Sequence, residues 1–496
     1  MSVCESQHSR DCTPPVHKLP KRLIDVGSAS STIKLVLGQD LPMGDSRYAT
    51  LSHCWGSKLP IRTLHENVTT FSNRIPLQQM PKSFSEAVAI TQGLGIQYLW
   101  IDALCIVQDS VEEWEVEALR MKDVYAGGVL NIAASDASSA DEGCFRNCAD
   151  RGEEKAVTFE FGDESGIARL AVKISTGDFR QATKRRMLST RGWVLQEQLL
   201  SSRVVSCMYP ELHWECKRIY QTEGGAQHHK SAPSYFGTPR LFWRSSVDSS
   251  QWMWWSWMQD FSSRNFTFWK DRLPALAGIT QHYATLFGDA PVLGLWQAQL
   301  IGDLLWVRLG KHRTLSDEDL HIGSLPSWSW LSCPAEIMFD FWQISSSTSQ
   351  RYIVNEDHSA LIDFQLEWSG PQLTSMISSA LLVLEGPAVE ASIQPLQNGR
   401  PANPPRLLLT AKAQGSNAVQ CVGQFDAKDP IPAIYTCLLL RSRSHSETGA
   451  RRSMFLILES VKDDTNLHLY RRVGLGCLSE QFSPLDDAAP RRLTLS

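Results

Sequence analysis

The sequence predicts an α/β fold: a mainly parallel sheet covered by helices, followed by a tryptophan-rich extension and a β-rich C-terminal region. Between residues 48 and 136, strand-like and helix-like segments alternate, as expected when helices connect parallel strands. Tryptophan is concentrated between residues 241 and 345, and because each buried indole adds a large apolar area, we expect a second packed unit there. After residue 346, short apolar runs separated by polar turns indicate antiparallel strands.

A chain of 496 residues is too long for one hydrophobic core. We predict an N-terminal arm over 1–45, a first domain over 46–210, the tryptophan-rich extension over 211–345 and the β-rich region over 346–496. The formal net charge of -5 gives no basic field for phosphates, so nucleic acid is not expected as a partner. The chain has no apolar run long enough to span a membrane, and its polar start lacks a signal peptide, so we expect a cytoplasmic protein.

The first domain follows a proline-containing arm with one short strand near 33–37. YATLSHCWG (48–56) is strand-like and ends at a glycine, and FSEAVAITQGLG (84–95) is helix-like and also ends at glycines. QYLWIDALCIVQD (97–109) is apolar on both sides of its centre, which predicts a buried parallel strand. Residues 110–125 repeat apolar side chains at steps of three and four, which predicts a helix.

The remaining elements follow the same patterns. GGVLNIAASD (127–136) is a further predicted strand, and the polar segment 136–187 is a predicted insertion with two hairpin strands, near 156–162 and 168–174. RGWVLQEQLLSSRVVSC (191–207) predicts a loop, a short helix and a strand that close the first domain. Strands of the β-rich region are expected at 380–386, 406–412, 433–442 and 453–461.

Twelve cysteines over this length are too dilute for a disulfide scaffold, and most are expected to be buried and reduced. A zinc site would have to combine the pair Cys144 and Cys148 with further ligands from the segment 213–229. Neither half has the two-residue cysteine spacing that makes such an assignment strong. We therefore predict no metal ion. The residues concerned are Cys144, Cys148, His213, Cys216, His228 and His229.

Four segments together resemble the fungal heterokaryon-incompatibility (HET) domain family: YATLSHCWG (48–56), YLWIDALCIVQDSVEEW (98–114), MKDVYAGG (121–128) and TRGWVLQEQLLSSRV (190–204). Later segments look like an extension found in long HET proteins, so the resemblance covers roughly residues 45–335. It implies a role in fungal non-self recognition and programmed cell death. The sequence shows no phosphate-binding loop and no repeat of the kind that would serve as a sensor.

The HET domain is thought to be similar to TIR domains, which have a flavodoxin-like sheet and some of which cleave NAD. This resemblance implies that Glu197, four residues after Trp193, is the catalytic residue. A carboxylate near the ribose stabilises the oxocarbenium character that develops when the bond to nicotinamide breaks, so NAD is the expected substrate and no cofactor is required. The residues expected to bind NAD are Ser52, Trp55, Asp102, Arg191 and Trp193.

The roles of these five residues differ. Trp193 offers a stacking face, and Arg191 suits a diphosphate because of its forked geometry. Ser52 and Trp55 lie at the carboxyl end of the first strand, where open parallel sheets bind ligands. Asp102 sits inside an apolar strand, where a lone carboxylate needs partners.

A purely structural role remains open for each of these residues. Trp193 is also compatible with the core, Arg191 with a surface or capping charge, and Ser52 and Trp55 with strand-end packing. Glu197 is compatible with an exposed helical acid or a partner for Arg203, and Asp102 with a structural hydrogen bond. Cys105 with His53 is a weaker nucleophile hypothesis, against an inert core thiol. Glu113 and Glu117 form either a paired-acid site or a solvated face, and Trp254, Trp255 and Trp257 form either a stacking site for a base or a core.

Three functions are compatible with the sequence. In the first, the HET domain is an enzyme that cleaves NAD. In the second, it is a non-catalytic module that signals through an unknown protein partner or through self-association. In the third, the chain is a divergent accessory protein of a metabolic gene cluster.

Overall fold

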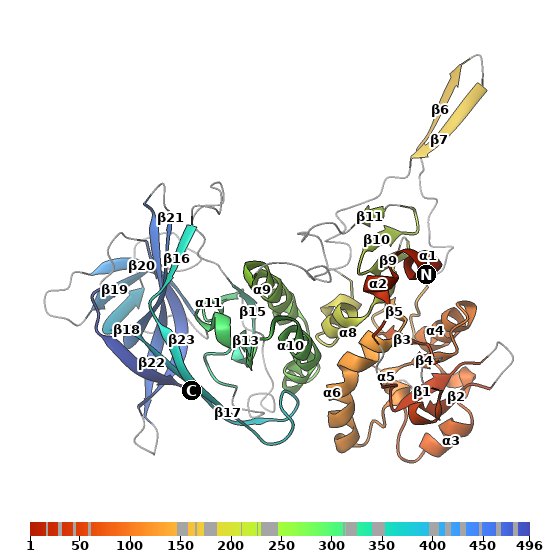
Figure 1. Cartoon of the computed structure of the whole chain (residues 1–496), viewed down its shortest axis with the longest axis horizontal. Helices are drawn as coiled ribbons and strands as arrows, with labels where there is room; N and C mark the ends of the chain where they lie inside the picture. Colours follow the sequence, from red (N-terminus) through yellow and green to blue (C-terminus); the bar gives the residue numbers. More distant parts are fainter. Residues whose placement is uncertain are drawn as a thin grey trace. The chain divides into compact units, whose positions relative to one another are not determined.

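The computed structural model of the chain is shown in Figure 1. It divides into two compact units, the first formed by residues 1–245 with 264–266 and the second by residues 246–263 with 267–496. The residues that the structure describes are 1–15, 18–27, 32–42, 46–57, 61–145, 157–163, 166–172, 186–209, 211–225, 227–229, 247–310, 313, 325–339, 353–395, 406–411, 418–426, 433–445, 449–462, 468–479 and 485–496.

The first unit is built on a nine-stranded sheet with the order β11-β10-β9-β8-β5-β3-β4-β1-β2. Its centre is parallel, because β3 pairs in parallel with both β4 and β5, and β5 pairs in parallel with β8. Antiparallel strands extend the sheet at both edges. The strands are β1 (Arg22–Asp25), β2 (Lys34–Leu37), β3 (Tyr48–Ser52), β4 (Tyr98–Trp100), β5 (Leu130–Ala134), β8 (Arg203–Cys207), β9 (His213–Cys216), β10 (Ile219–Thr222) and β11 (Gln227–His229).

Helices connect the parallel strands and cover both faces of the sheet. α4 (Lys82–Gly93) joins β3 to β4 and contacts both, whereas α6 (Val111–Gly127) and α8 (Val194–Leu200) pack against each other. Right-handed crossovers place helices on opposite faces when the strand order reverses, and Figure 1 shows α4 on one side of the sheet with α6 and α8 on the other. The predicted alternation of strands and helices in this domain is confirmed.

One predicted strand is much shorter than expected. The strand predicted over 97–109 ends at Trp100, and a short helix, α5 (Asp102–Cys105), follows it. Asp102 causes the change, because its carboxylate accepts the Ala103 N–H at 2.7 Å, and a side chain that binds nearby backbone favours a helix start over a strand. The placement of Asp102 inside a strand is therefore wrong, and its side chain is 30% exposed.

Both ends of the first domain contain further structure. The predicted arm contributes β1, β2 and two short helices, α1 (Ser2–Gln7) and α2 (Ser9–Cys12). α3 (Val68–Asn73) lies between β3 and α4. The predicted hairpin of the insertion is confirmed as β6 (Val157–Asp163) paired with β7 (Gly166–Val172). β9 follows β8 into the same sheet, so the segment after residue 211 continues the first unit.

The second unit begins with the tryptophan-rich part. Trp254, Trp255 and Trp257 on α9 are all less than 5% exposed, so the core hypothesis for these indoles is confirmed. The indoles of Trp254 and Trp330 both donate to the carbonyl of Gly294, at 3.0 and 2.9 Å. The elements here are α9 (Val247–Ser263), α10 (Pro274–Phe287), α11 (Leu300–Asp303), β12 (Pro291–Val292), β13 (Leu295–Trp296), β14 (Val307–Leu309) and β15 (Glu336–Met338).

The rest of the second unit is a mainly antiparallel assembly in which β18, β19, β20, β23, β22 and β21 form a closed ring, because β21 also pairs with β18. Leu409, Phe455 and Ile457 are among the fully buried side chains of its core. The strands predicted in this region are confirmed. They are β16 (Ile353–Asp357), β17 (Ala360–Trp368), β18 (Ile377–Pro395), β19 (Arg406–Ala411), β20 (Val419–Phe425), β21 (Ala433–His445), β22 (Arg451–Lys462), β23 (His468–Leu478) and β24 (Pro490–Leu495).

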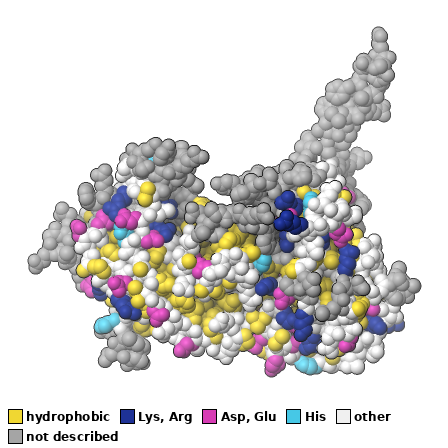
Figure 2. Space-filling model, viewed as in Figure 1, with side chains coloured by type: hydrophobic (Ala, Val, Ile, Leu, Met, Phe, Trp, Pro, Cys, Tyr) yellow, Lys and Arg dark blue, Asp and Glu magenta, His cyan; other side chains and the backbone are white. Residues whose placement is uncertain are grey.

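The surface carries charges of both signs. Figure 2 shows basic and acidic side chains interspersed over the face in view. In the second unit, ion pairs such as Arg451–Asp486 at 2.7 Å and Arg471–Glu459 at 2.6 Å join opposite charges. Among the described residues, no helix combines the length and the apolar character needed to cross a membrane.

Candidate functional site

A polar cluster lies where β3 and β4 end. Ser52 is the last residue of β3, and Trp55 follows it in the same loop. The indole N–H of Trp55 donates to Asp102 Oδ2 at 3.0 Å. His53 lies between Ser52 and Trp55 in the sequence. Its Nδ1 is 3.7 Å from Asp102 Oδ1, and its ring is parallel to that of Trp55. The loop after β3 is thus tied to the residue that follows β4.

Glu197 on α8 reaches the same cluster from the neighbouring strand connection. Its side chain is buried, with 6% of the residue exposed. Burial raises the pKa of Glu197 to about 7, although hydrogen bonding with Ser52 and the charge of Arg191 act to lower it. The carboxylate of Asp102 adds to the rise in pKa, and a hydrogen bond from Tyr125 opposes it. Glu197 therefore changes its charge near neutral pH.

Two further residues complete the buried floor of the cluster. Ser52 Oγ donates to Asn131 Oδ1 at 3.1 Å, and the Asn131 amide donates to the backbone carbonyl of Glu197 at 3.5 Å. Tyr125 is 2% exposed, and burial together with the charges of Glu197 and Asp102 raises the pKa of its phenol. Asn131 and Tyr125 hold Ser52 and Glu197 together from β5 and α6.

Arg191 lies at the rim of the cluster and is held by the backbone around it. Its guanidinium donates to the carbonyl of His53, and its own carbonyl accepts from Arg264 Nη1 at 3.2 Å. The next amide, that of Gly192, donates to the Asn265 carbonyl at 2.9 Å. A Cβ on Gly192 would lie 1.9 Å from Phe266 Cζ, so only glycine fits this turn without displacing that ring. The turn before α8 is thereby fixed.

Trp193 takes a different position. It is half-buried and forms an edge-to-face contact with Trp114 of α6, with ring centroids 6.1 Å apart. It packs partly on the core of the sheet. The structure thus brings Ser52, Trp55, Asp102, Arg191 and Glu197 into one cluster and places Trp193 beside it, one helical turn before Glu197.

The cluster has a buried floor and a partly exposed rim. Glu197, Ser52, His53, Tyr125 and Asn131 are buried, whereas Trp55, Asp102 and Arg191 are half-buried. A separate hollow lies at the carboxyl ends of β5 and β8. It contains none of the six predicted site residues, and its lining includes Asp136, Glu142, Cys144, Cys207, Tyr209 and Leu212. Glu197 therefore lies beside the last residue of β3, but its side chain is buried and does not line this hollow.

Several cluster residues escape prediction from the sequence. Tyr125 belongs to the apolar stripe of its helix, and Asn131 lies within an apolar run. Asn131 carries a usable signal, because a fully buried strand with one amide side chain must supply that amide with partners. His53 enters the sequence-based hypotheses only as a partner for Cys105. Burial lowers the pKa of His53 to about 4, so the ring is neutral at physiological pH.

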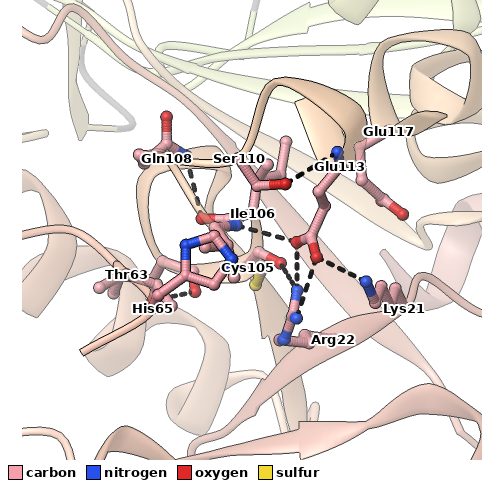
Figure 3. A network of polar contacts seen from close by, with 12 residues as sticks. Lys21, Arg22, Thr63, His65, Cys105, Ile106, Gln108, Ser110, Glu113 and Glu117 are labelled. Atoms are coloured by element: carbon pink, nitrogen blue, oxygen red, sulfur yellow. Dashed lines mark hydrogen bonds and ion pairs between the residues drawn. The ribbon is translucent and has the colours of Figure 1, made fainter. Parts of the chain in front are cut away.

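The acidic pair on α6 has a structural role. The carboxylate of Glu113 accepts hydrogen bonds from Arg22, from Lys21 at 2.5 Å and from the Val107 amide at 2.9 Å (Figure 3). Burial acts to raise the pKa of Glu113, but these hydrogen bonds lower it to about 2. Glu117 is 1% exposed and binds Arg120 at 3.0 Å. The solvated-face hypothesis is wrong for both residues, and each is held by its own basic partners.

Cys105 and Arg203 both have structural roles. Burial raises the pKa of Cys105 to about 12, and its side chain belongs to the main core, so the inert-thiol hypothesis is confirmed. Arg203 donates to Cys4 Sγ and to the Val129 carbonyl and not to Glu197. No disulfide joins the cysteines within the described ranges.

An open, centrally parallel sheet with helices on both faces defines the first unit as an α/β domain. Residues 48–197 of this unit match the family model of the heterokaryon incompatibility protein (HET), and the chain therefore contains a HET domain. The matched range begins at the first residue of β3 and ends at Glu197. No curated protein and no solved structure matches the chain.

Proposed function

We propose that this protein acts in heterokaryon incompatibility as part of fungal non-self recognition and programmed cell death, and that its HET domain cleaves NAD. The observation that carries this proposal is the convergence of Glu197, Ser52 and Tyr125 in one cluster with Asp102, which also binds Trp55. A buried carboxyl whose pKa is raised to about 7, lying beside the last residue of a parallel strand, is typical of a reactive group.

The strand order supports a TIR-like assignment. The parallel strands lie in the order β4-β3-β5-β8, which is second, first, third and fourth along the chain. Flavodoxin-like sheets share this order and bind ligands where it reverses, between the first and third strands. In this chain those strands are β3 and β5, which provide Ser52 and Asn131.

The chemistry needs a single carboxylate. When the bond between ribose C1′ and the nicotinamide nitrogen breaks, its electron pair leaves with nicotinamide, and positive charge develops on the ribose. The Glu197 carboxylate stabilises that charge, and water then attacks C1′ to give ADP-ribose and a proton. The cationic nicotinamide ring lowers the pKa of Glu197 on binding, so binding itself ionises the carboxyl. In this proposal Arg191 binds the diphosphate, and Trp55 and Trp193 provide aromatic faces.

Substrate access sets a structural requirement. Glu197 is buried, and Trp55, Asp102 and Arg191 are half-buried, so the proposal requires that NAD displace side chains of the cluster to reach the carboxyl. Binding must therefore open the rim of the site, as in enzymes whose substrates drive a conformational step.

The experiment is an assay of the purified full chain with NAD, in which nicotinamide and ADP-ribose are quantified by chromatography. We expect equal amounts of the two products from the wild type and none from Glu197→Gln. The matched control is Glu112→Gln, which makes the same change on the exposed side of a helix and should keep full activity. If the wild type leaves NAD intact, or Glu197→Gln cleaves it at the wild-type rate, the enzymatic proposal fails.

The second candidate function is a non-catalytic HET module that signals by self-association or through a protein partner. The 6% exposure of Glu197, with its polar partners inside the domain, favours this function because a satisfied buried acid needs no substrate. If the domain is such a module, expression of the Glu197→Gln variant in a fungal cell-death assay should cause as much cell death as expression of the wild type. The enzymatic proposal predicts survival.

A further inference from the structure

Three cysteines and one histidine from distant parts of the first unit meet at the edge of its sheet. Cys4, His8 and Cys12 come from α1, α2 and the residue between them, and Cys216 is the last residue of β9. One ligand atom from each lies within 4.8 Å of all the others. The three cysteines are at most 2% exposed, and His8 is half-buried.

The local sequence explains why the four side chains converge. Cys4, His8 and Cys12 follow one another at intervals of four residues, and helical residues four apart share one face. This face packs against the end of β9, where Ile219 and Trp214 enclose the sulfur atoms. The N-terminal helices thus present three donors to a fourth that lies on the sheet.

We propose that this cluster binds one zinc ion as a structural Cys3His site. Zinc in structural sites is tetrahedral, with Zn–S of about 2.3 Å and Zn–N of about 2.0 Å, so the ligand atoms of a Cys3His site lie about 3.5 to 3.8 Å apart. His8 Nδ1 and Cys216 Sγ are already 3.6 Å apart. The remaining pairs lie within 4.8 Å, so small side-chain rotations complete the tetrahedron.

The charges around the cluster fit a zinc thiolate centre. Arg203 is 2% exposed and donates from Nε to Cys4 Sγ at 3.3 Å. Over the described part of the chain, Arg203 forms no ion pair with a carboxylate, and an anion beside a buried guanidinium offsets part of its desolvation cost. Three thiolates and one Zn²⁺ carry a net charge of −1, which Arg203 neutralises.

A second donor points to the same conclusion. The backbone N–H of Arg218 donates to Cys216 Sγ at 3.4 Å. Hydrogen bonds to ligating sulfur atoms are typical of the shell around metal sites and help to orient the ligands. Neutral thiols accept hydrogen bonds only weakly, so a cluster without a metal does not explain the two donors, the Arg203 guanidinium and the Arg218 amide. The zinc ion would hold α1 and α2 against β9 and contribute directly to the stability of the first unit.

Of the zinc ligands considered from sequence spacing, only Cys216 joins this cluster within the described residues. Cys144 lies beside Cys207, and His213 lies beside Tyr220. Cys148 and the side chains of His228 and His229 lie outside the described residues.

The test measures zinc in the full chain, purified under reducing conditions without chelator and incubated with zinc chloride. Mass spectrometry of the elements should give about one zinc per chain after removal of loosely bound metal. Replacement by Co²⁺ should give the intense visible bands of tetrahedral cobalt and a thiolate-to-cobalt transition in the near ultraviolet. These two measurements use the wild type and do not depend on the folding of a variant.

Variants assign the ligands. Cys216→Ser and His8→Ala should bind zinc at least about tenfold more weakly, whereas His8→Cys should keep it because a Cys4 set is an equally good structural site. The matched controls are Cys105→Ala, a buried thiol with no ligand partner, and His65→Ala, an exposed histidine. Both should retain about one equivalent.

Three results would overturn the proposal. In the first, the zinc-treated wild type holds less than about one-tenth of an equivalent and gives no cobalt bands. In the second, the intact mass and the thiol count show a disulfide between two of the three cysteines in the reduced preparation. Full zinc binding by both Cys216→Ser and His8→Ala would also contradict the site, because the metal would then be held elsewhere.

Discussion

The indole N–H of Trp55 donates to the carboxylate of Asp102 at 3.0 Å, which joins the loop after β3 to the first residue of α5. The two residues come from different strand connections, and together they form part of the rim above Glu197.

Trp55→Phe tests this contact. The variant keeps an aromatic ring and removes only the N–H donor, so the free energy of unfolding should fall by about 1 kcal/mol. Urea denaturation of the full chain, followed by circular dichroism, measures the change. Trp252→Phe alters an indole that is 44% exposed and should leave stability unchanged. Equal stabilities for wild type and Trp55→Phe would mean that the hydrogen bond adds nothing to the fold.

Glu197→Gln should stabilise the protein at alkaline pH. The folded pKa of about 7 lies above the ordinary value of 4.5, so the unfolded chain ionises first and the wild type loses stability as pH rises from 4.5 to 7. Above pH 7 the loss is on the order of 3 kcal/mol, and glutamine removes it. Denaturation midpoints at pH 5 and pH 8.5 should differ between the two proteins only at the higher pH. A constant difference at both values would contradict the raised pKa.

Glu113→Gln should have the opposite pH dependence. The pKa of Glu113 is lowered from 4.5 to about 2 by Arg22, Lys21 and the Val107 amide, so its contribution to stability is present above pH 4.5 and is lost as pH falls toward 2. The variant should be less stable than the wild type at pH 7, and the two should converge on acidification. Thermal melts between pH 3 and pH 7 provide the comparison, with Glu112→Gln as the control on the same helix. Parallel curves would show that the ion pairs do not stabilise the fold.

Asp303→Ala should destabilise the second unit. The Asp303 carboxyl is fully buried and accepts from the Trp255 indole at 2.7 Å and from the Trp296 amide at 2.9 Å. Alanine leaves both donors buried without an acceptor, which costs about 2 to 4 kcal/mol in free energy of unfolding. Asp303→Asn keeps one acceptor oxygen and should lose less. Calorimetry of the full chain measures both variants, and an alanine variant as stable as the wild type would contradict this assignment.

Local patterns in the sequence predict much of the first unit. Alternating apolar and amphipathic runs locate β3, β5, α4, α6 and α8, because strand and helix periodicities are properties of neighbouring residues. The strand predicted at 97–109 is too long, since Asp102 binds its neighbouring amide and starts a helix. Composition also predicts the tryptophan-rich core, because each indole has a large apolar area and many indoles in one segment are best buried against one another.

The parts that the sequence does not reveal depend on contacts between distant residues. Tyr125 and Asn131 reach Glu197 only once α6, β5 and α8 are packed together. Sequence spacing groups Cys216 with its neighbours along the chain, whereas its partners are more than 200 residues earlier, as with His8. The ring closure between β18 and β21 is of the same kind. No periodicity within a strand specifies which strand it will pair with.

β24 has a consequence for biosynthesis. Its residues 490–495 pair with β18, from Leu382↔Leu495 to Pro387↔Pro490. A translating ribosome therefore releases every strand of the first unit long before the second unit has its final hydrogen-bonding partner. Because pairing between remote segments is slow, the HET domain should reach its native state on the ribosome while β18 still presents an incomplete edge to chaperones.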